Sequence, residues 1–512
     1  MIGRPDDPAF LYFPENYRWS MGLLICLSAA PWTGIEIDEV HRVGRALEGH
    51  IGDDHAWFEE WTRMGERIEA RGRDAQSEGH RRTAASCFMR ASRYYQTGER
   101  FIHTRSARSM EVYAKSVQLF REAATIIRYP RIEPVEVPYA SASLPALLVH
   151  PDASSSARRA PCMVFFDGFD VTKELQYGYG IPDLAARGIG CLIVDGPGNG
   201  ESVRFRNLPL IAETERYATA AYEYLAARSE FDPRRIGVMA LSLGGYYAPR
   251  AAALEPRFAC CVAWGAQWDY HAIWVKRLDE LATGKVLSLS VPPEHLQWVL
   301  GVDSQAAALK KLEGFRLDGI VQNMRCPFLL LHGEGDEQIP IELARKCFEA
   351  AGSKEKTLRL FGREEGGFHH CQVDNVSIGV HAMWDWLEDV LSPGAESRGC
   401  RRTKAEPTLT GSRRLVEGLP PNRYLFAVLP RQSSALVIRA VARQRGVKCA
   451  ADQVIGQPFL RSSSRCSADC GLRRVAWRPP ARRSTRRRAP RWLVFSATST
   501  RHASSQTRQP RS

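Results

Sequence analysis

The first 130 residues carry apolar side chains at the spacing expected of amphipathic helices. Steps of four, three and four residues place such side chains on one helix face. The clearest stripe is Trp57, Trp61, Met64 and Ile68. A second stripe follows from Cys87 onward. We therefore predict that residues 1–130 form a helical N-terminal cap region, in which these stripes pack against neighbouring helices.

From residue 132 onward the pattern changes to short, unbroken apolar runs that alternate with helical stretches. The runs span residues 162–166, 191–194, 236–239, 258–264, 328–331 and 358–361. Unbroken runs of this length are typical of strands that are buried on both faces of a parallel sheet. We predict an α/β fold over residues 131–395, with a doubly wound, mostly parallel sheet that binds its ligand at the carboxyl ends of the strands.

About sixty residues lie between the 258–264 strand and the 328–331 strand, which is too many for a simple crossover connection. We predict that this segment, residues 265–325, is a helical insertion over the sheet edge. The final helix of the body ends near Leu391. Its predicted stripe is Ile378, Ala382, Trp386 and Val390.

The net charge of +13 is distributed unevenly along the chain. Residues 397–512 hold 26 Lys and Arg against 4 Asp and Glu, whereas the first 396 residues hold 44 against 53, a net charge of −9. A mildly acidic body has no electrostatic reason to bind phosphate backbones, so we expect no specific nucleic-acid partner. The tail lacks periodicity and is rich in Arg, Ser and Pro, which predicts a disordered segment.

The sequence contains no stretch that suits a membrane span or a secretory signal. Residues 21–30 have half of the ~20 residues that a span needs and follow no basic region, so we predict a buried helix. The 13 cysteines are scattered, several of them inside apolar runs, which favours a reducing cytoplasm and no disulfides. Cys466 and Cys470 lack a second ligand pair at zinc spacing, so we expect neither a metal nor another cofactor.

Ser242 lies at a predicted strand-to-helix turn, within Ala-Leu-Ser-Leu-Gly at residues 240–244. A serine on such a strained turn needs very small residues two positions to either side, because larger side chains would collide. Gly244 meets this need, and Ala240 departs only slightly from the G-x-S-x-G pattern. Ser242 is therefore the candidate nucleophile, beside the N-terminus of a helix.

A base and an orienting acid follow in the loops after the next strands. Asp336 comes shortly after the 328–331 strand, and His369 and His370 lie in the loop after the 358–361 strand. A carboxylate on one such loop can reach a histidine on the next, and the order Ser, Asp, His suits a catalytic triad. A core or surface histidine is the alternative for either imidazole.

Two further loops lie at the same predicted edge. The loop after the 162–166 strand is placed to lend a backbone N–H to an oxyanion hole, which we assign to Phe169, and the second N–H comes from Leu243. Residues 195–202 form a glycine-rich turn without the spacing or the distant acid of a dinucleotide site. We interpret this turn as a structural element at the rim of the site.

These motifs resemble the α/β-hydrolase superfamily. The helical N-terminal region with its tryptophans, residues 167–174, and His370 with the following Cys-Gln pair resemble one branch in particular. That branch contains dihydroxypseudooxynicotine hydrolase and fungal polyketide chain-shortening hydrolases, and the resemblance spans roughly residues 10–392. It implies an α/β-hydrolase fold that hydrolyses a C–C bond adjacent to a ketone in an aryl or polyketide-like substrate.

The resemblance also assigns two roles. It places the catalytic histidine directly before the Cys-Gln pair, which selects His370 over His369. It maps an acidic, substrate-orienting residue near the oxyanion loop onto Asp170, for which a surface or structural carboxylate is the alternative.

Other functions stay open at this point. A carboxylesterase acting on an aryl or acyl ester would use the same triad, and a catalytically inactive hydrolase fold would only bind its ligand. Each takes a small-molecule substrate or ligand, and a homodimer is one candidate assembly. A carbon leaving group needs a second carbonyl to accept its electrons, so β-diketones are the expected C–C substrates. The residues fit both an acyl-serine and direct attack by water.

Overall fold

The computed structural model describes residues 10–102, 106–152, 159–283 and 291–392. The predictions for the basic tail, including Cys466 and Cys470, lie outside these residues. Among the helices that are described, none has the length and apolar character needed to cross a membrane.

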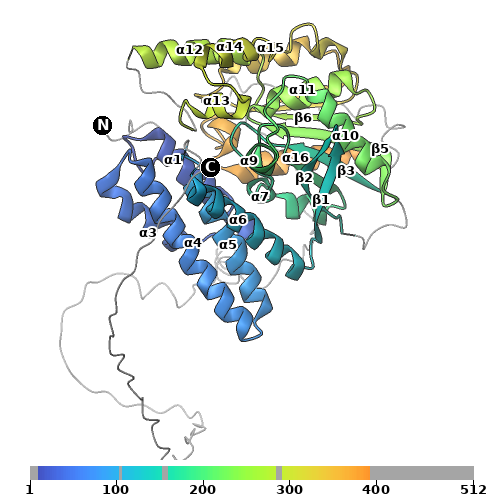
Figure 1. Ribbon diagram of the computed structural model, residues 1–512. Coiled ribbons are helices and arrows are strands. Elements are labelled where there is room, and N and C mark those ends of the chain that lie inside the picture. The colour runs from blue at the N-terminus through green and yellow to red at the C-terminus, as the bar shows by residue number, and fades with distance from the viewer. Residues whose placement is uncertain (1–9, 103–105, 153–158, 284–290, 393–512) are drawn as a thin grey trace, which may run out of the picture. The chain divides into compact units, whose positions relative to one another are not determined.

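The N-terminal region is helical, as Figure 1 shows. Its elements are α1 (Tyr17–Ser28), α2 (Ala30–Thr33), α3 (Ile37–Leu47), the 3-10 helix η1 (Glu48–His50), α4 (Asp54–Ser77), α5 (Arg81–Glu99) and α6 (Ala107–Ile126). Asn16, Asp53 and Ser106 cap α1, α4 and α6, because their side chains accept hydrogen bonds from backbone N–H groups in the first turn. The predicted stripe of α4 is buried throughout, with both tryptophans fully covered.

Eight strands form one sheet in the order β1-β2-β4-β3-β5-β6-β7-β8. They are β1 (Ile132–Tyr139), β2 (Ala142–Val149), β3 (Ala160–Phe166), β4 (Gly190–Val194), β5 (Phe231–Leu241), β6 (Cys261–Trp264), β7 (Phe328–Gly333) and β8 (Lys356–Phe361). The pairs β1·β2 and β2·β4 are antiparallel and all others are parallel, which confirms the predicted mostly parallel sheet. Two strands begin elsewhere than predicted: β5 begins at residue 231 rather than 236, and β6 begins at residue 261 rather than 258.

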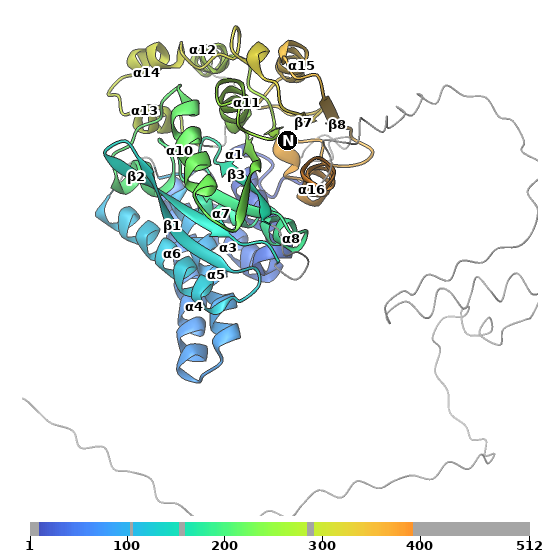
Figure 2. The ribbon, with the colours of Figure 1, turned by 90° about the vertical axis from the view of Figure 1, so that its right-hand side faces the viewer.

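Helices cover both faces of the sheet (Figure 2). They are α7 (Lys173–Tyr177), α8 (Ile181–Ala186), α9 (Gly200–Phe205), α10 (Thr214–Ala226), α11 (Gly244–Leu254), α12 (Tyr270–Ala282), α13 (His295–Leu300), α14 (Gln305–Leu312), α15 (Ile341–Ala350) and α16 (Val376–Leu391), with the 3-10 helices η3 (Val321–Asn323) and η4 (His370–Gln372). Met163 and Phe165 of β3 pack towards the N-terminal helices, α8 and α16, whereas Val164 and Phe166 pack towards α10–α15. This alternation explains why the strands read as unbroken apolar runs.

The stripe predicted for the last helix was wrong by about half a turn. The fully buried face of α16 begins at Val376 and continues through Val380, Trp384 and Leu387, while the predicted residues are only partly covered. Both stripes are apolar, and periodicity alone does not distinguish a buried stripe from an apolar flank.

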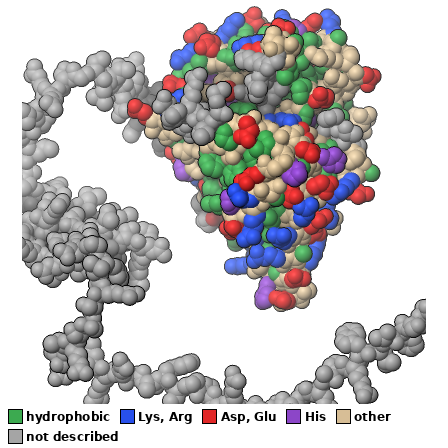
Figure 3. Space-filling model, turned by 90° about the vertical axis from the view of Figure 1, so that its left-hand side faces the viewer, with side chains coloured by type: hydrophobic (Ala, Val, Ile, Leu, Met, Phe, Trp, Pro, Cys, Tyr) green, Lys and Arg blue, Asp and Glu red, His purple; other side chains and the backbone are tan. Residues whose placement is uncertain are grey.

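The face drawn in Figure 3 carries a mixture of acidic and basic side chains rather than an area of one sign. This mixture accords with the small net charge of the first 396 residues.

Candidate active site

Ser242 occupies a sharp turn between β5 and α11. Its φ angle is +61°, in the left-handed region that residues with a side chain rarely adopt. A Cβ added to Gly244 would lie 2.4 Å from the Cβ of Ala240 and 3.0 Å from the carbonyl oxygen of Asp167. The small residues on either side of Ser242 are therefore a steric requirement of this turn.

His370 lies between Ser242 and Asp336. Its Nε2 is 2.8 Å from the Ser242 Oγ, and its Nδ1 is 2.7 Å from an Asp336 carboxylate oxygen. In this arrangement Nδ1–H donates to the carboxylate, and Nε2 is free to accept the serine proton. The other candidate, His369, instead packs its ring edge-on against Phe368, with 5.3 Å between ring centroids.

Backbone groups hold the Asp336 carboxylate in place. The N–H groups of Gln338 and Ile339 donate to its second oxygen at 2.8 and 2.9 Å. On the histidine side, Cys371 has a φ of +50°, and its thiol lies 3.4 Å from the backbone oxygen of Trp264. The Asp336 loop therefore holds its own carboxylate, and the Cys371 contact places the histidine loop against the end of β6.

The acid and the imidazole shift each other's pKa in opposite directions. Burial favours a neutral Asp336, but the positive charge and hydrogen bond of His370 outweigh it and hold the Asp336 pKa below its usual value. Burial likewise disfavours a charged His370, but the Asp336 carboxylate, with a further contribution from Cys371, raises the His370 pKa well above 6.5. The pair therefore favours an ionised acid next to a basic imidazole.

The loop after β3 lies directly against the serine turn. A Cβ added to Gly168 would lie 3.0 Å from the Ser242 Cβ. The Asn199 side chain donates to the backbone oxygens of Gly168 at 2.8 Å and Val171 at 3.3 Å, which braces this loop. No described residue accepts a hydrogen bond from the backbone N–H of Phe169 or of Leu243.

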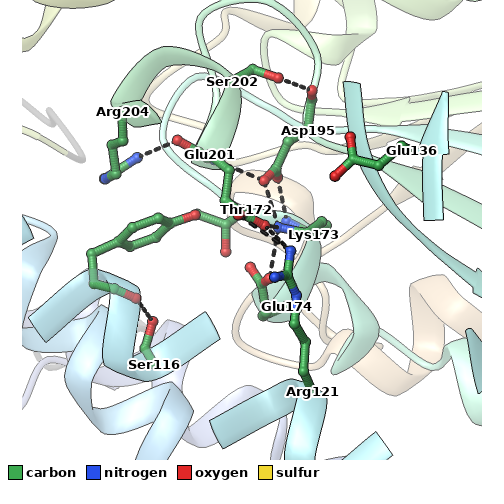
Figure 4. Close-up of polar contacts among 12 residues, drawn as sticks. Ser116, Arg121, Glu136, Thr172, Lys173, Glu174, Asp195, Glu201, Ser202 and Arg204 are labelled. Atoms are coloured by element: carbon green, nitrogen blue, oxygen red, sulfur yellow. Dashed lines mark hydrogen bonds and ion pairs between the residues drawn. The ribbon is translucent and has the colours of Figure 1, made fainter. Parts of the chain in front are cut away.

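The glycine-rich turn after β4 is buried rather than a rim element. Asp195 is fully buried and accepts hydrogen bonds from the backbone N–H and the Nζ of Lys173, at 2.9 and 2.8 Å. Lys173 also pairs with Glu174 and Glu201, each at 2.7 Å. Figure 4 shows these four residues, here named the Lys173 cluster, with Arg121 reaching Glu201 from α6. The cluster ties α6, α7 and α9 to the end of β4.

A pocket opens onto the serine. Its lining residues are Met21, Ile25, Arg100, Asp170, Val171, Tyr179, Leu241, Ser242, Trp264, Gln338, His370, Cys371, Val373 and Val376. The N-terminal helices thus supply one wall, through α1 and the end of α5. None of the described residues in the predicted insertion, 265–325, lines this pocket.

The inserted helices contact the oxyanion loop instead. The His295 Nε2 lies 3.4 Å from the backbone oxygen of Phe169, and the Phe169 ring packs against Tyr270 and Trp274. The tryptophans of α4 are buried in the core, and neither lines the pocket.

Asp170 lies in the pocket wall, paired with a residue that the sequence analysis missed. It forms a salt bridge with Arg100, and the two side chains are only 6% and 4% exposed. Asp170 is therefore not a surface carboxylate. Seventy residues separate the partners, and no periodicity or motif marks Arg100 as a site residue.

Comparisons with known proteins agree with this architecture. The profile of the prolyl oligopeptidase family matches residues 181–394, and that of the FrsA-like esterases matches residues 47–287. The chain is 27% identical to the hydrolase acrC of Aspergillus aculeatus, over 74% of this chain and 98% of that protein. It is 26% identical to the 2,6-dihydropseudooxynicotine hydrolase of Paenarthrobacter nicotinovorans, over 69% of this chain and 88% of that protein.

A solved structure shares the fold. The crystal structure of 2,6-dihydroxy-pseudo-oxynicotine hydrolase superimposes with a TM-score of 0.60 at 23% identity, covering 72% of this chain and 96% of that one.

Proposed function

We propose that this chain, a hydrolase with the α/β-hydrolase fold, uses a serine triad to cleave a C–C bond adjacent to a ketone in an aryl or polyketide-like substrate. The observation that supports this most strongly is the position of His370, within hydrogen-bond distance of both Ser242 and Asp336. The three residues come from loops after three different strands. Packing of the fold does not require their side chains to form this hydrogen-bonded chain.

Each residue takes a role that its surroundings suit. His370 removes the Ser242 proton as the hydroxyl attacks a carbonyl, and Asp336 holds the imidazole in the required tautomer. The N–H groups of Phe169 and Leu243 receive the charge that develops on the carbonyl oxygen, and each such donor is worth about 3 kcal/mol of transition-state stabilisation.

The preference for C–C cleavage rests on the relatives and on the pocket. A carbon leaving group departs only if its electrons are accepted elsewhere, which a second carbonyl does by forming an enolate. The relatives include a 2,6-dihydropseudooxynicotine hydrolase, and the polar pair in the pocket wall suits an oxygen-bearing leaving group. Asp170 then orients the substrate through this pair.

Ester hydrolysis is the second candidate, because the FrsA-like esterase profile matches residues 47–287. The two reactions share the attack by Ser242 and differ in the leaving group. An alkoxide needs only a proton from His370, whereas an enolate needs a stabilising group for its oxygen.

A matched pair of substrates separates the two candidates. An aryl β-diketone and an aryl ester with the same acyl group are offered to the purified full chain, and the products are identified by mass spectrometry. We expect the diketone to yield an acid and a ketone. Turnover of the ester alone would favour the esterase, and turnover of neither would favour a binding module.

A further inference from the structure

The wall of the pocket contains a buried ion pair that the triad does not use. Arg100 follows the last turn of α5, and Asp170 follows Phe169 in the loop against the serine turn. Both residues line the same pocket as Ser242 and His370. A buried pair of this kind carries a large desolvation cost, and apolar side chains of similar size would pack at least as well. Packing alone therefore does not explain why the pair lies here.

The pairing with Asp170 does not use every N–H donor of the Arg100 guanidinium group. One Nη binds the Asp170 carboxylate, and the other donates to the backbone oxygen of Asp170 at 3.4 Å. The Nε of Arg100 is buried and has no hydrogen-bond partner among the described residues. An unpaired buried N–H is costly unless a ligand satisfies it.

The position of the guanidinium group is fixed relative to the serine. Asp170 is anchored by its loop, which Asn199 braces on either side through Gly168 and Val171. A donor held in this way needs no reorganisation when charge develops beside it. The planar, delocalised guanidinium group also suits an oxygen anion better than a hydrated ammonium group does.

We infer that Arg100, held by Asp170, binds the oxygen of the leaving enolate, an inference that rests on the proposed C–C cleavage. Ser242 attacks one carbonyl of a 1,3-dicarbonyl substrate, and the bond between that carbon and the central carbon breaks. The electron pair moves onto the central carbon and the second carbonyl oxygen, where an N–H of Arg100 donates to the developing charge. The His370 imidazolium then protonates the central carbon, the ketone leaves, and water hydrolyses the acyl-serine.

The chain offers a matched control for this role. Arg204 of α9 forms a salt bridge with Glu99 at the end of α5, with side chains 7% and 2% exposed and an N–O distance of 2.7 Å. It is also a buried ion pair that joins α5 to the body, but neither residue lines the pocket. A merely structural role predicts that Arg100→Gln and Arg204→Gln change both reactions in the same way.

The test compares kcat for the aryl β-diketone and for the aryl ester with the same acyl group. We expect Arg100→Gln to lower kcat for the diketone about 100-fold or more, as for loss of an oxyanion donor, and to change kcat for the ester less than about tenfold. Arg204→Gln should change both values by one factor. Equal losses for the two substrates in Arg100→Gln would overturn the inference.

A second variant and a binding measurement cover two other outcomes. If Arg100→Gln does not fold, the double variant Arg100→Met/Asp170→Leu removes both charges without leaving one unpaired, and the same selective loss in kcat for the diketone is expected.

If the native chain cleaves no diketone, the proposed function fails, and a binding measurement decides the role of Arg100. A 5-aryl-cyclohexane-1,3-dione, an enolate at neutral pH, should bind Ser242→Ala about tenfold or more tightly than Ser242→Ala/Arg100→Gln by calorimetry. Equal affinities would refute the anion-binding role.

Discussion

Two buried polar groups lie at the carboxyl edge of the same sheet and differ in what they do. In the Lys173 cluster, one ammonium group pairs with three carboxylates at 2.7–2.8 Å, and Lys173 is 1% exposed. In the triad, one imidazole joins one carboxylate to a hydroxyl that faces a pocket. Both groups include residues from segments that follow the carboxyl ends of strands, so their position in the fold does not distinguish them.

The Lys173 cluster and the triad differ in whether a polar group is left free to react. Burial disfavours the charged form of Lys173, but the carboxylates, Asp195 foremost, outweigh it and raise its pKa well above the usual value, which favours the ammonium form. Ser242 instead sits on a strained backbone beside an imidazole that can accept its proton. Removing one partner from a fully paired buried charge destabilises the fold, whereas a strained hydroxyl next to a base and a cavity supports chemistry.

Ser242→Ala should produce the largest functional change. Loss of the nucleophile should lower kcat about 10⁴-fold or more on any substrate, while the thermal unfolding midpoint changes little. Steady-state kinetics and calorimetric unfolding test both statements. Retained turnover would exclude Ser242 as the nucleophile and leave only the architecture.

Lys173→Met should produce the opposite result. It removes the buried cation that pairs with Asp195 and Glu174 and leaves Glu201 its contact with Arg121, so we expect a loss of about 3–5 kcal/mol in the free energy of unfolding, measured by urea denaturation. The matched control is Lys115→Met, because Lys115 pairs with Glu69 at 3.3 Å on an exposed side chain and should cost at most about 1 kcal/mol. Equal losses in the two variants would contradict a structural role for the Lys173 cluster.

Gly168→Ala should affect both properties moderately. The new Cβ would lie 3.0 Å from the Ser242 Cβ and from the backbone oxygen of Leu241, so the loop must shift, at a cost of about 1–3 kcal/mol in stability and a loss of kcat. Gly196→Ala is the control, since its Cβ would come no closer than 3.5 Å to its neighbours. If kcat in Gly168→Ala matches that of the native chain, this loop does not position the reacting groups.

The pH profile should show the smallest change. His370 acts as a base only when neutral, and its pKa is raised, so kcat/KM should rise with pH with a midpoint above 6.5. Because Cys371 contributes to the shift, Cys371→Ala should move that midpoint downward. His369→Gln should leave the midpoint in place. A midpoint at or below pH 6.5 in the native chain would contradict the close pairing of His370 with Asp336.

The sequence predicted the sheet because both of its faces are buried. The apolar runs fall within β3, β4, β5, β7 and β8 and agree with their bounds to within two residues, except that β5 begins five residues before the predicted run. The resemblance to dihydroxypseudooxynicotine hydrolase, the fold class and the hydrolase class are confirmed by the comparisons. The antiparallel β1 and β2 were foreseen only as β-rich segments, since their pairing depends on contacts that no local pattern encodes.

The candidate site was predictable only where a local pattern marks it. The strained turn at Ser242 requires small neighbours, and Asp336 and His370 follow strand ends, so all three are visible in the sequence. Their catalytic roles, the oxyanion donors, the cytoplasmic location and the homodimer stay predictions. Arg100 was missed because its importance comes from a tertiary contact with Asp170, and the buried position of Asp195 was missed because a glycine-rich turn usually lies at the surface.

The most direct test of a nucleophilic Ser242 is its labelling by a fluorophosphonate, followed by peptide mass spectrometry. We predict one covalent adduct, on the peptide that contains Ser242, formed by the native chain and lost in His370→Ala. Absence of an adduct from the folded native chain, or an adduct that persists at full rate without His370, would contradict a triad at this site.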